Sequence, residues 1–267
     1  MAVVTVLQLA DVSVRFGGLW ACQKVSFEIA HGELFAIIGP NGAGKTTVVN
    51  AITGVYVPAP GSVIRFTDRA GTTHDLVGRR PYQIVRLGIA RTFQNLGLFD
   101  ALTVLQNLML GRYIYRRANL LQAGFWTRRA VDDEVANRAK VEEVIDLLEI
   151  SQYRREKVGE LPYGIRKRVE LGRALAQEPD LLLLDEPMAG MNVEEKQDMV
   201  RFIYDARRQL STTMVLIEHD MGVVMSIADR IAVLNFGELI ALGTPEQVQQ
   251  DPQVIAAYLG TRAQRGD

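Results

Sequence analysis

The sequence has a single cysteine, Cys22, and three histidines among its 267 residues. One cysteine excludes an internal disulfide and a cysteine-based metal cluster, and such low usage is typical of proteins from a reducing compartment. His31, His74 and His219 lie far apart and lack metal-ligand spacing, so no structural metal is expected. Cys22 is therefore interpreted as a small, buried apolar residue.

The sequence also lacks an excess of charge and a long apolar run. Its thirty basic and thirty-one acidic residues give a formal net charge of −1, so no nucleic-acid partner is expected. No run of about eighteen apolar residues occurs, so the chain is not expected to span a bilayer by itself. The N-terminal stretch reaches Asp11 without a basic region, which is unlike a signal peptide.

The apolar residues that are present, within a composition that is 48% hydrophobic, follow two strand patterns. Val25, Phe27 and Ile29 alternate with a period of two, which predicts antiparallel strands with one solvated face. Three continuous apolar runs are typical of strands buried on both faces of a parallel sheet: residues 34–38, 181–184 and 213–217. Helical patterns lie between these runs, so the sequence predicts an α/β fold.

Between residues 81 and 177 the strand signal vanishes and helical periodicity replaces it. Val141, Val144, Ile145 and Leu148 recur on one helical face. We therefore predict an α/β core with an antiparallel β part, formed by residues 1–80 and 178–267, and a mostly helical subdomain inserted at 81–177. Residues 230–243 are predicted to form two strands, followed by a helical tail.

The stretch GPNGAGKT, residues 39–46, matches the phosphate-loop pattern G-x-x-x-x-G-K-[ST] and lies between a buried strand and a helix-compatible segment. Glycines let successive N–H groups point at phosphates, Lys45 supplies a positive charge, and the Thr46 hydroxyl can bind Mg²⁺. A glycine-rich turn that matches by chance is the alternative. We predict that ATP is bound by Gly39, Pro40, Asn41, Gly42, Ala43, Gly44, Lys45, Thr46 and Thr47.

Two carboxylates, Asp185 and Glu186, follow the buried run 181–184. Ligands of α/β sheets bind at the carboxyl ends of the strands. Asp185 is expected to hold Mg²⁺, directly or through water, and Glu186 to polarise the water that attacks the γ-phosphate. Two solvated carboxylates at a strand end are the alternative interpretation.

The phosphate loop is followed by RTFQN (91–95), LPYGI (161–165), LLLLDEP (181–187) and IEHD (217–220). This ordered set resembles the ATP-binding subunit of ABC transporters over nearly the whole chain, which implies a P-loop nucleotide-binding core in one ATP-binding domain. The tyrosine and glycine of LPYGI, AGMN (189–192), IEHDMGVVM (217–225) and the tail from residue 243 to 260 are most similar to the ATPases of branched-chain amino acid importers.

The resemblance implies roles for further residues. Gln94 would touch the metal or the attacking water, His219 would contact the γ-phosphate, and Phe16 would stack on the adenine. The alternatives are a capping glutamine, a structural histidine and a core aromatic residue. Asp220 and residues 189–192 would lie near a dimer interface, although relatives often carry aspartate where Asn192 stands.

In this family two subunits face each other, and each ATP lies between the loop of one and the signature L-S-G-G-Q of the other. Here the signature reads Leu161, Pro162, Tyr163, Gly164 and Ile165. The serine hydroxyl is absent and proline has no N–H donor. One lost charge-assisted hydrogen bond costs about 1.5–3 kcal/mol, which Arg166, Lys167 and the helix dipole would partly offset.

Three hypotheses for the pairing of the chain follow: a decayed ATPase, a homodimer, and a heterodimer whose second ATP-binding subunit supplies a full signature. Lys45, Thr46, Asp185, Glu186 and His219 occur together, which argues against decay. The resemblance favours the heterodimer.

The resemblance further implies a peripheral ATPase on the cytoplasmic face of a bacterial-type inner membrane. Its partners would be transmembrane permease subunits and, indirectly, a solute-binding protein, and its cargo a branched-chain amino acid or a similar small polar solute, which the sequence does not identify. A lipid or lipopolysaccharide extraction ATPase and a soluble ABC-type protein acting on nucleic acid or the ribosome are the alternatives. The former normally keeps the signature serine, and the latter usually carries two cassettes.

Residues 111–134 hold five arginines and four aromatic residues. They fit a solvated helix pair, or a docking surface for a cytoplasmic helix of the permease, which loss of Arg116 and Arg117 would weaken. Direct membrane contact through the aromatic side chains is a third hypothesis. These aromatic residues are Tyr113, Tyr115, Phe125 and Trp126.

Overall fold

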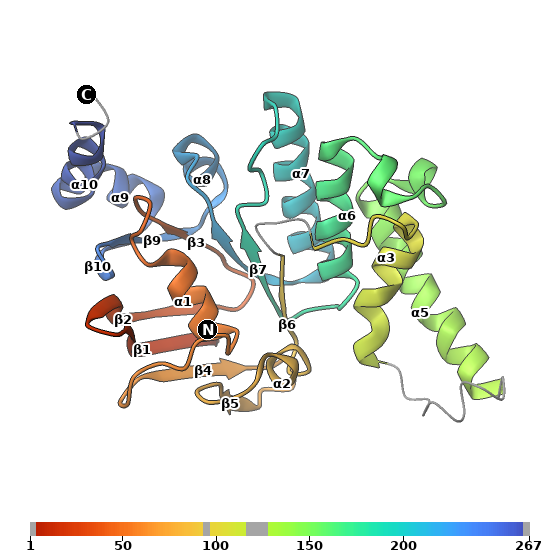
Figure 1. The fold of residues 1–267 in the computed structure, drawn as a ribbon, viewed down its shortest axis with the longest axis horizontal. Helices are drawn as coiled ribbons and strands as arrows, with labels where there is room; N and C mark the ends of the chain where they lie inside the picture. Colours follow the sequence, from red (N-terminus) through yellow and green to blue (C-terminus); the bar gives the residue numbers. More distant parts are fainter. Residues whose placement is uncertain (1–3, 93–96, 116–127, 264–267) are drawn as a thin grey trace. The chain divides into compact units, whose positions relative to one another are not determined.

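The computed structural model describes residues 4–92, 97–115 and 128–263 (Figure 1). The predicted site residue Gln94 lies outside these ranges, as do Arg116, Arg117, Phe125 and Trp126 of the arginine-rich stretch. Within the described ranges, no helix combines the length and apolar character needed to cross a membrane.

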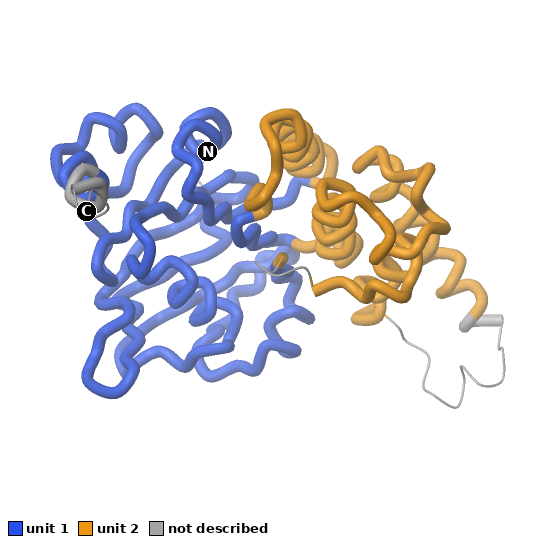
Figure 2. The backbone as a smooth tube through the Cα atoms, turned by 45° about the horizontal axis from the view of Figure 1, so that its top comes forward, with its two compact units in different colours: residues 1–91, 180–186, 211–267 blue, residues 92–179, 187–210 orange. Residues whose placement is uncertain are grey.

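The chain divides into two compact units, drawn in different colours in Figure 2. Residues 1–91, 180–186 and 211–267 form the first unit, and residues 92–179 and 187–210 form the second. This division differs from the expected one in three places, of which the shift of residues 178–179 into the second unit is the smallest. Residues 81–91 belong to the first unit because they end in a strand of its sheet, and residues 187–210 belong to the second because their helix packs against its other helices.

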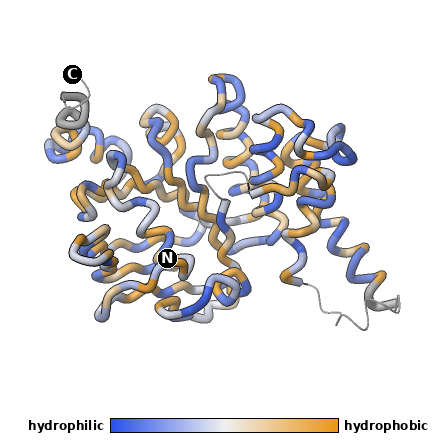
Figure 3. Tube along the Cα trace, in the orientation of Figure 1, coloured by the Kyte–Doolittle hydropathy of each residue, from blue (hydrophilic) through white to orange (hydrophobic). Residues whose placement is uncertain are grey.

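The larger sheet of the first unit has six strands in the order β10-β9-β3-β8-β7-β6. Its inner strands pair in parallel, and β10 pairs antiparallel with β9. All five residues of β3, β7 and β8 are buried, which confirms the interpretation of the continuous apolar runs. Most of the length of these strands is hydrophobic in Figure 3. The strand bounds are β3 Leu34–Ile38, β6 Ile89–Arg91, β7 Leu181–Asp185, β8 Thr213–Ile217, β9 Arg230–Asn235 and β10 Glu238–Gly243.

The prediction that residues 81–177 contain no strand is wrong at β6, Ile89–Arg91, which pairs in parallel with β7. This strand has only three residues, too few to produce an alternating or continuous apolar pattern. Its backbone is extended because it pairs with β7 at the edge of the sheet.

A second sheet of four antiparallel strands has the order β2-β1-β4-β5. Val25, Phe27 and Ile29 of β2 are buried while the residues between them are exposed, as the alternation predicts. The core of the unit includes buried residues of both sheets, and Phe27 of β2 stacks on Phe35 of β3 with ring centroids 5.0 Å apart. The bounds are β1 Thr5–Phe16, β2 Leu19–Ala30, β4 Val63–Thr67 and β5 Thr73–Asp75.

Helix α1, Lys45–Ile52, contributes Val48, Val49, Ala51 and Ile52 to the same core. It packs against β1 and β2, so one face of the helix that follows the phosphate loop is buried, while Thr46 is exposed. The other helices of the unit are α2 Pro81–Val85, α8 Met221–Ile227, α9 Pro245–Gln250 and α10 Pro252–Ala263. The α/β fold class is thereby confirmed.

The described part of the second unit is helical. Val141, Val144, Ile145 and Leu148 are buried, as their spacing predicts. Gly172 lets helix α6 pack closely, because a Cβ atom there would lie 2.9 Å from Leu148 Cδ1. The elements are α3 Val104–Gly111, η1 Arg112–Tyr115, α5 Arg128–Leu147, η2 Ser151–Tyr153, η3 Val158–Glu160, α6 Tyr163–Leu175 and α7 Val193–Leu210.

Candidate nucleotide-binding site

The phosphate loop connects β3 to α1 and has a backbone that only glycine allows at two points. Gly39 and Gly44 have φ angles of 150° and 99°. A Cβ atom would lie 2.1 Å from the Leu234 carbonyl oxygen at Gly39, and 2.5 Å from the Ala21 carbonyl oxygen at Gly44. The neighbouring backbone therefore fixes the loop, and any side chain at these positions would displace it.

The turn between β9 and β10 also braces the loop. The Gly237 N–H donates to the carbonyl oxygen of Ala43 at 3.1 Å, and the Gly237 carbonyl accepts from the Gln23 N–H at 2.8 Å. Two segments that are distant in sequence, residues 21–23 and 234–237, thus hold the loop from outside. Positive φ angles at Gly39, Gly42 and Gly44 are of the kind that lets successive N–H groups of a loop face an anion.

Lys45 begins α1 and is buried, with 8% of its surface exposed. Its ammonium group donates to the carbonyl oxygens of Gly39 at 2.7 Å and Pro40 at 3.0 Å. Burial lowers the pKa of Lys45, and the carboxylates of Glu186 and Asp185 oppose that shift. The Lys45 side chain is therefore held inside the loop, within the electrostatic reach of the two carboxylates.

Asp185 and Glu186 stand at the carboxyl end of β7. The side chain of Asp185 is 4% exposed, so it is not the solvated carboxylate of the alternative interpretation. Glu186 has a φ angle of +48°, uncommon for a residue with a side chain, and its N–H donates to the Ile217 carbonyl oxygen at 2.9 Å. Such backbone conformations concentrate at functional sites.

His219 lies two residues beyond the end of β8, and 61% of its side chain is exposed. It is therefore not a core histidine. The adjacent Asp220 caps α8, because its carboxylate accepts from the N–H of Val223 at 3.4 Å. β3, β8 and β7 are parallel neighbours, so their carboxyl ends lie at the same end of the sheet. The phosphate loop, His219 and the Asp185–Glu186 pair all follow these carboxyl ends.

Phe16 ends β1 and is 49% exposed, so it is not a core aromatic residue. Its ring meets the edge of Tyr56, with centroids 5.0 Å apart and planes at 78°. Tyr56 was not singled out from the sequence, because nothing in its neighbourhood marks it as a partner of Phe16. The pair presents an accessible aromatic surface suited to stacking on a base.

The signature residues lie in the second unit, where Pro162 is the N-cap of α6 and makes no side-chain capping bond. Gly164 is tightly packed, because a Cβ atom there would lie 2.4 Å from Glu195 Oε1. Arg166 pairs with Asp100 at 2.8 Å, and Lys167 is buried beside Glu170 at 3.3 Å. Both cations therefore have carboxylate partners, which limits the positive charge available to an anion near Pro162 and so their ability to offset the missing serine.

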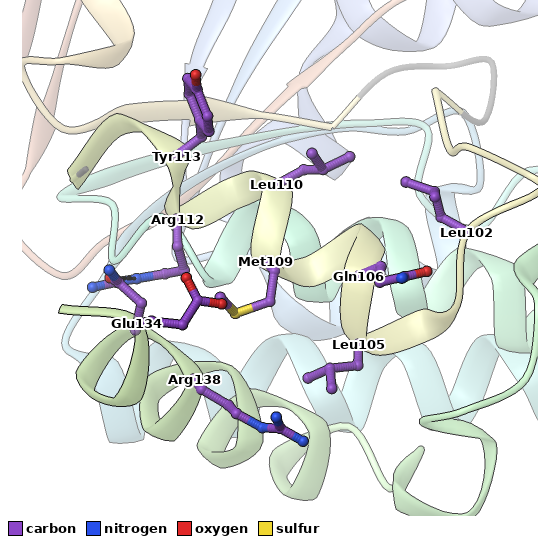
Figure 4. Close-up of a pocket in the computed structure, with 10 residues that line it drawn as sticks. Leu102, Leu105, Gln106, Met109, Leu110, Arg112, Tyr113, Glu134 and Arg138 are labelled. Atoms are coloured by element: carbon purple, nitrogen blue, oxygen red, sulfur yellow. Dashed lines mark hydrogen bonds between the residues drawn. The ribbon is translucent and has the colours of Figure 1, made fainter. Parts of the chain in front are cut away.

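The second unit also carries a groove of about 440 Å³ between α3 and α5 (Figure 4). Leu105, Met109 and Leu110 of α3 provide apolar surface, and Glu134 and Arg138 of α5 add charge. Arg112 lines the groove while donating to Asn137 Oδ1 at 2.9 Å and to the Ala176 carbonyl oxygen at 2.8 Å. The remaining lining residues are Leu102, Gln106, Tyr113 and Asn137.

Comparisons with protein families and curated proteins give consistent matches. A family model described as ABC transporter matches residues 22–189, and one described as branched-chain amino acid ATP-binding cassette transporter matches residues 238–264. The branched-chain amino acid transport ATP-binding protein LivG of Escherichia coli K12 is 40% identical, over 95% of this chain and 97% of its own. BraF of Pseudomonas aeruginosa PAO1 is 39% identical, over 96% and 98%.

Solved structures resemble the chain over a similar extent. The ADP conformation of an ATP-binding cassette from an ABC transporter has a TM-score of 0.81 at 29% identity, covering 96% of this chain and 99% of its own. A nucleotide-free cassette from an ABC transporter has a TM-score of 0.80 at 29% identity, covering 95% and 98%.

Proposed function

The chain belongs to the ABC transporter family of ATP-binding proteins, and on that premise we propose that it energises an importer of branched-chain amino acids or similar small polar solutes. It binds nucleotide and is an ATPase whose hydrolysis is coupled to transport. The importer proposal is carried by the match of residues 238–264 to the branched-chain amino acid family, outside the part that the general ABC model covers. The LivG and BraF relatives support it over the lipid-extraction alternative.

We propose the following roles for the predicted site residues, as the family resemblance implies and the positions of the described residues support. The backbone of residues 39–47 surrounds the phosphates, and Lys45 neutralises them. Glu186 accepts a hydrogen bond from the attacking water, and His219 contacts the γ-phosphate. Phe16, supported by Tyr56, stacks on the adenine. The two units together form one ATP-binding domain, in which Gln94 contacts the metal or the water.

The donor set at the loop fits Mg²⁺. Thr46 and Asp185 offer a hydroxyl and a carboxylate, and Mg²⁺ prefers such oxygen ligands together with phosphate oxygens. Among the described residues, no cluster of three or more His, Cys, Asp or Glu side chains could hold a metal without a nucleotide. Thr46, Asp185 and Gln94 are therefore assigned to a cation that arrives with ATP and neutralises charge on the transferring phosphoryl group.

We assign the chain to the cytoplasmic face of the inner membrane, as a peripheral partner of transmembrane permease subunits that receive solute from a binding protein. The groove between α3 and α5 is the proposed docking surface for a cytoplasmic permease helix, because its apolar floor and charged flank suit an amphipathic helix. Tyr113 and Leu110 are exposed by 61% and 39% and line it.

Replacing both Leu110 and Tyr113 by serine tests the docking surface. Copurification with the permease subunits should be lost while ATP affinity is unchanged. The matched control is Tyr204→Ser, since Tyr204 is 51% exposed on α7 and does not line the groove. Unchanged copurification would reject this surface, and binding of the wild-type chain to bare vesicles that depends on Tyr113 would favour direct membrane contact instead.

Solute uptake tests the proposed function. Cells that lack the chain should lose uptake of labelled leucine, isoleucine and valine, and the wild-type gene should restore it. Glu186→Gln should not restore uptake, although the protein still binds ATP, because the water would lack its base. Uptake of glutamate is the control. Normal branched-chain uptake without the chain would refute the assigned cargo.

A further inference from the structure

Arg91, the last residue of β6, makes charge-assisted contacts with two different elements. One terminal nitrogen of its guanidinium donates to Asp185 Oδ2 at 2.7 Å. The other donates to Asn50 Oδ1 at 2.7 Å and to the Thr53 hydroxyl at 3.3 Å. The Arg91 and Asp185 side chains are only 11% and 4% exposed, so the ion pair is removed from water.

These contacts connect the two parts of the nucleotide site that come from distant sequence. Asn50 belongs to α1, the helix that starts with Lys45 and Thr46, whereas Asp185 ends β7. Arg91 reaches both because β6 lies beside β7 at the edge of the sheet. The planar guanidinium can donate along two directions at once, which a lysine ammonium on a flexible stem does not reproduce.

Removing the Arg91–Asp185 ion pair from water costs desolvation free energy, so its presence needs an explanation. A buried ion pair often stabilises a fold no better than apolar residues of similar volume, while loss of one partner leaves an uncompensated charge. The side chain of Lys45 also lies within electrostatic reach of Asp185. The Arg91 guanidinium is held in place by Asn50, so it cannot move along with Asp185 if that side chain rotates. It therefore fixes the direction of the Asp185 carboxylate.

We propose that Arg91 is a positioning residue that holds the Asp185 carboxylate in a fixed orientation relative to the phosphate loop and thereby sets the affinity of the site for the divalent cation bound with ATP. The proposal rests on the assignment of Asp185 to that cation. Arg91 touches neither nucleotide nor water in this role; it acts through Asp185, with Asn50 and Thr53 as its anchor.

The experiment measures two affinities on the full chain. Binding of free Mn²⁺ is followed by electron paramagnetic resonance at saturating ATP, and ATP binding is measured separately in EDTA. Arg91→Gln should weaken Mn²⁺ binding about tenfold, the equivalent of one charge-assisted hydrogen bond, and change metal-free ATP binding less than about twofold. Arg91→Lys should restore only part of the Mn²⁺ affinity.

Two further variants keep the outcome decisive. Arg86→Gln is the matched control, since Arg86 is exposed five residues upstream. Asn50→Ala retains the ion pair but removes its anchor, so it should weaken Mn²⁺ binding about threefold even if Arg91→Gln fails to fold. Wild-type Mn²⁺ affinity in Arg91→Gln, or in Asn50→Ala where Arg91→Gln does not fold, overturns the proposal. So does an equal loss of metal-free ATP binding.

Asp185→Asn separates this inference from the assignment on which it rests. If Asp185→Asn lowers Mn²⁺ affinity and Arg91→Gln does not, only the role of Arg91 is wrong. If Asp185→Asn itself leaves Mn²⁺ affinity unchanged, the metal assignment of Asp185 fails.

Discussion

The Tyr163 hydroxyl donates a hydrogen bond to the main-chain carbonyl oxygen of Ala189 at 3.0 Å. The ring also lies against Gly190, where a Cβ atom would come within 3.2 Å of Tyr163 Cε1. The next signature residue, Gly164, packs against Glu195, whose carboxylate accepts from the Asn192 N–H at 3.0 Å. The signature is thus joined to residues 189–195 by two adjacent contacts within the second unit.

Tyr163→Phe removes only the hydroxyl of this contact. We expect a loss of about 0.5–1 kcal/mol in unfolding free energy and faster amide hydrogen exchange at residues 189–192, because that segment loses an anchor. Mass spectrometry measures the exchange. Tyr204→Phe, on an exposed position of α7, is the control. Equal exchange rates in Tyr163→Phe and wild type would show that the contact does not hold the segment.

Gly164→Ala places a methyl group where the Glu195 carboxylate lies. The carboxylate must move, which disrupts its bond to the Asn192 N–H at the start of α7, so we expect a loss of about 1–2 kcal/mol. Chemical denaturation measures this loss. Gly18→Ala is the control, because a Cβ atom there meets nothing within 4 Å. In the Glu195→Ala background the cost of Gly164→Ala should largely disappear, and a persistent cost would contradict this account.

Pro162 should prevent the chain from closing on ATP with a copy of itself. We expect Glu186→Gln, with hydrolysis blocked, to bind ATP and Mg²⁺ and yet remain monomeric in size-exclusion chromatography, because Pro162 provides neither a hydroxyl nor an N–H. A second ATP-binding subunit with a serine signature should form a heterodimer with it. Adding Pro162→Ser should shift the chain itself toward a dimer. An ATP-dependent dimer of Glu186→Gln alone would instead support the homodimer.

Because of Cys22, the unfolding free energy should fall as the pH becomes alkaline. Burial raises the pKa of its thiol from 9.0 to about 11. The thiol has a higher pKa in the folded state than in the unfolded state. The contribution of Cys22 to the unfolding free energy is therefore fully present below pH 9 and is lost as the pH rises toward about 11. Unfolding free energy measured across this window should fall in wild type and fall less steeply in Cys22→Ala. Identical slopes would indicate that the thiol does not contribute.

Much of the fold followed from local patterns. The continuous runs of β3, β7 and β8, the alternation in β2 and the buried face around Val141 are confirmed, since each is a short contiguous segment whose burial follows its own periodicity. Strand β6 was missed because three residues carry no period. The assignment of residues 187–210 to the core also differed, because helical spacing does not specify which neighbours a helix packs against.

The phosphate loop and the order of the motifs could be predicted from the sequence, because GPNGAGKT and each later motif are contiguous stretches whose residue types are specific. The partners of Arg91 could not be predicted in this way, because Arg91 lies 41 residues from Asn50 and 94 from Asp185 in the sequence. The same holds for the contact between Tyr163 and Ala189, which lie 26 residues apart. Strand order and helix packing bring such side chains together, and no local spacing encodes either of them.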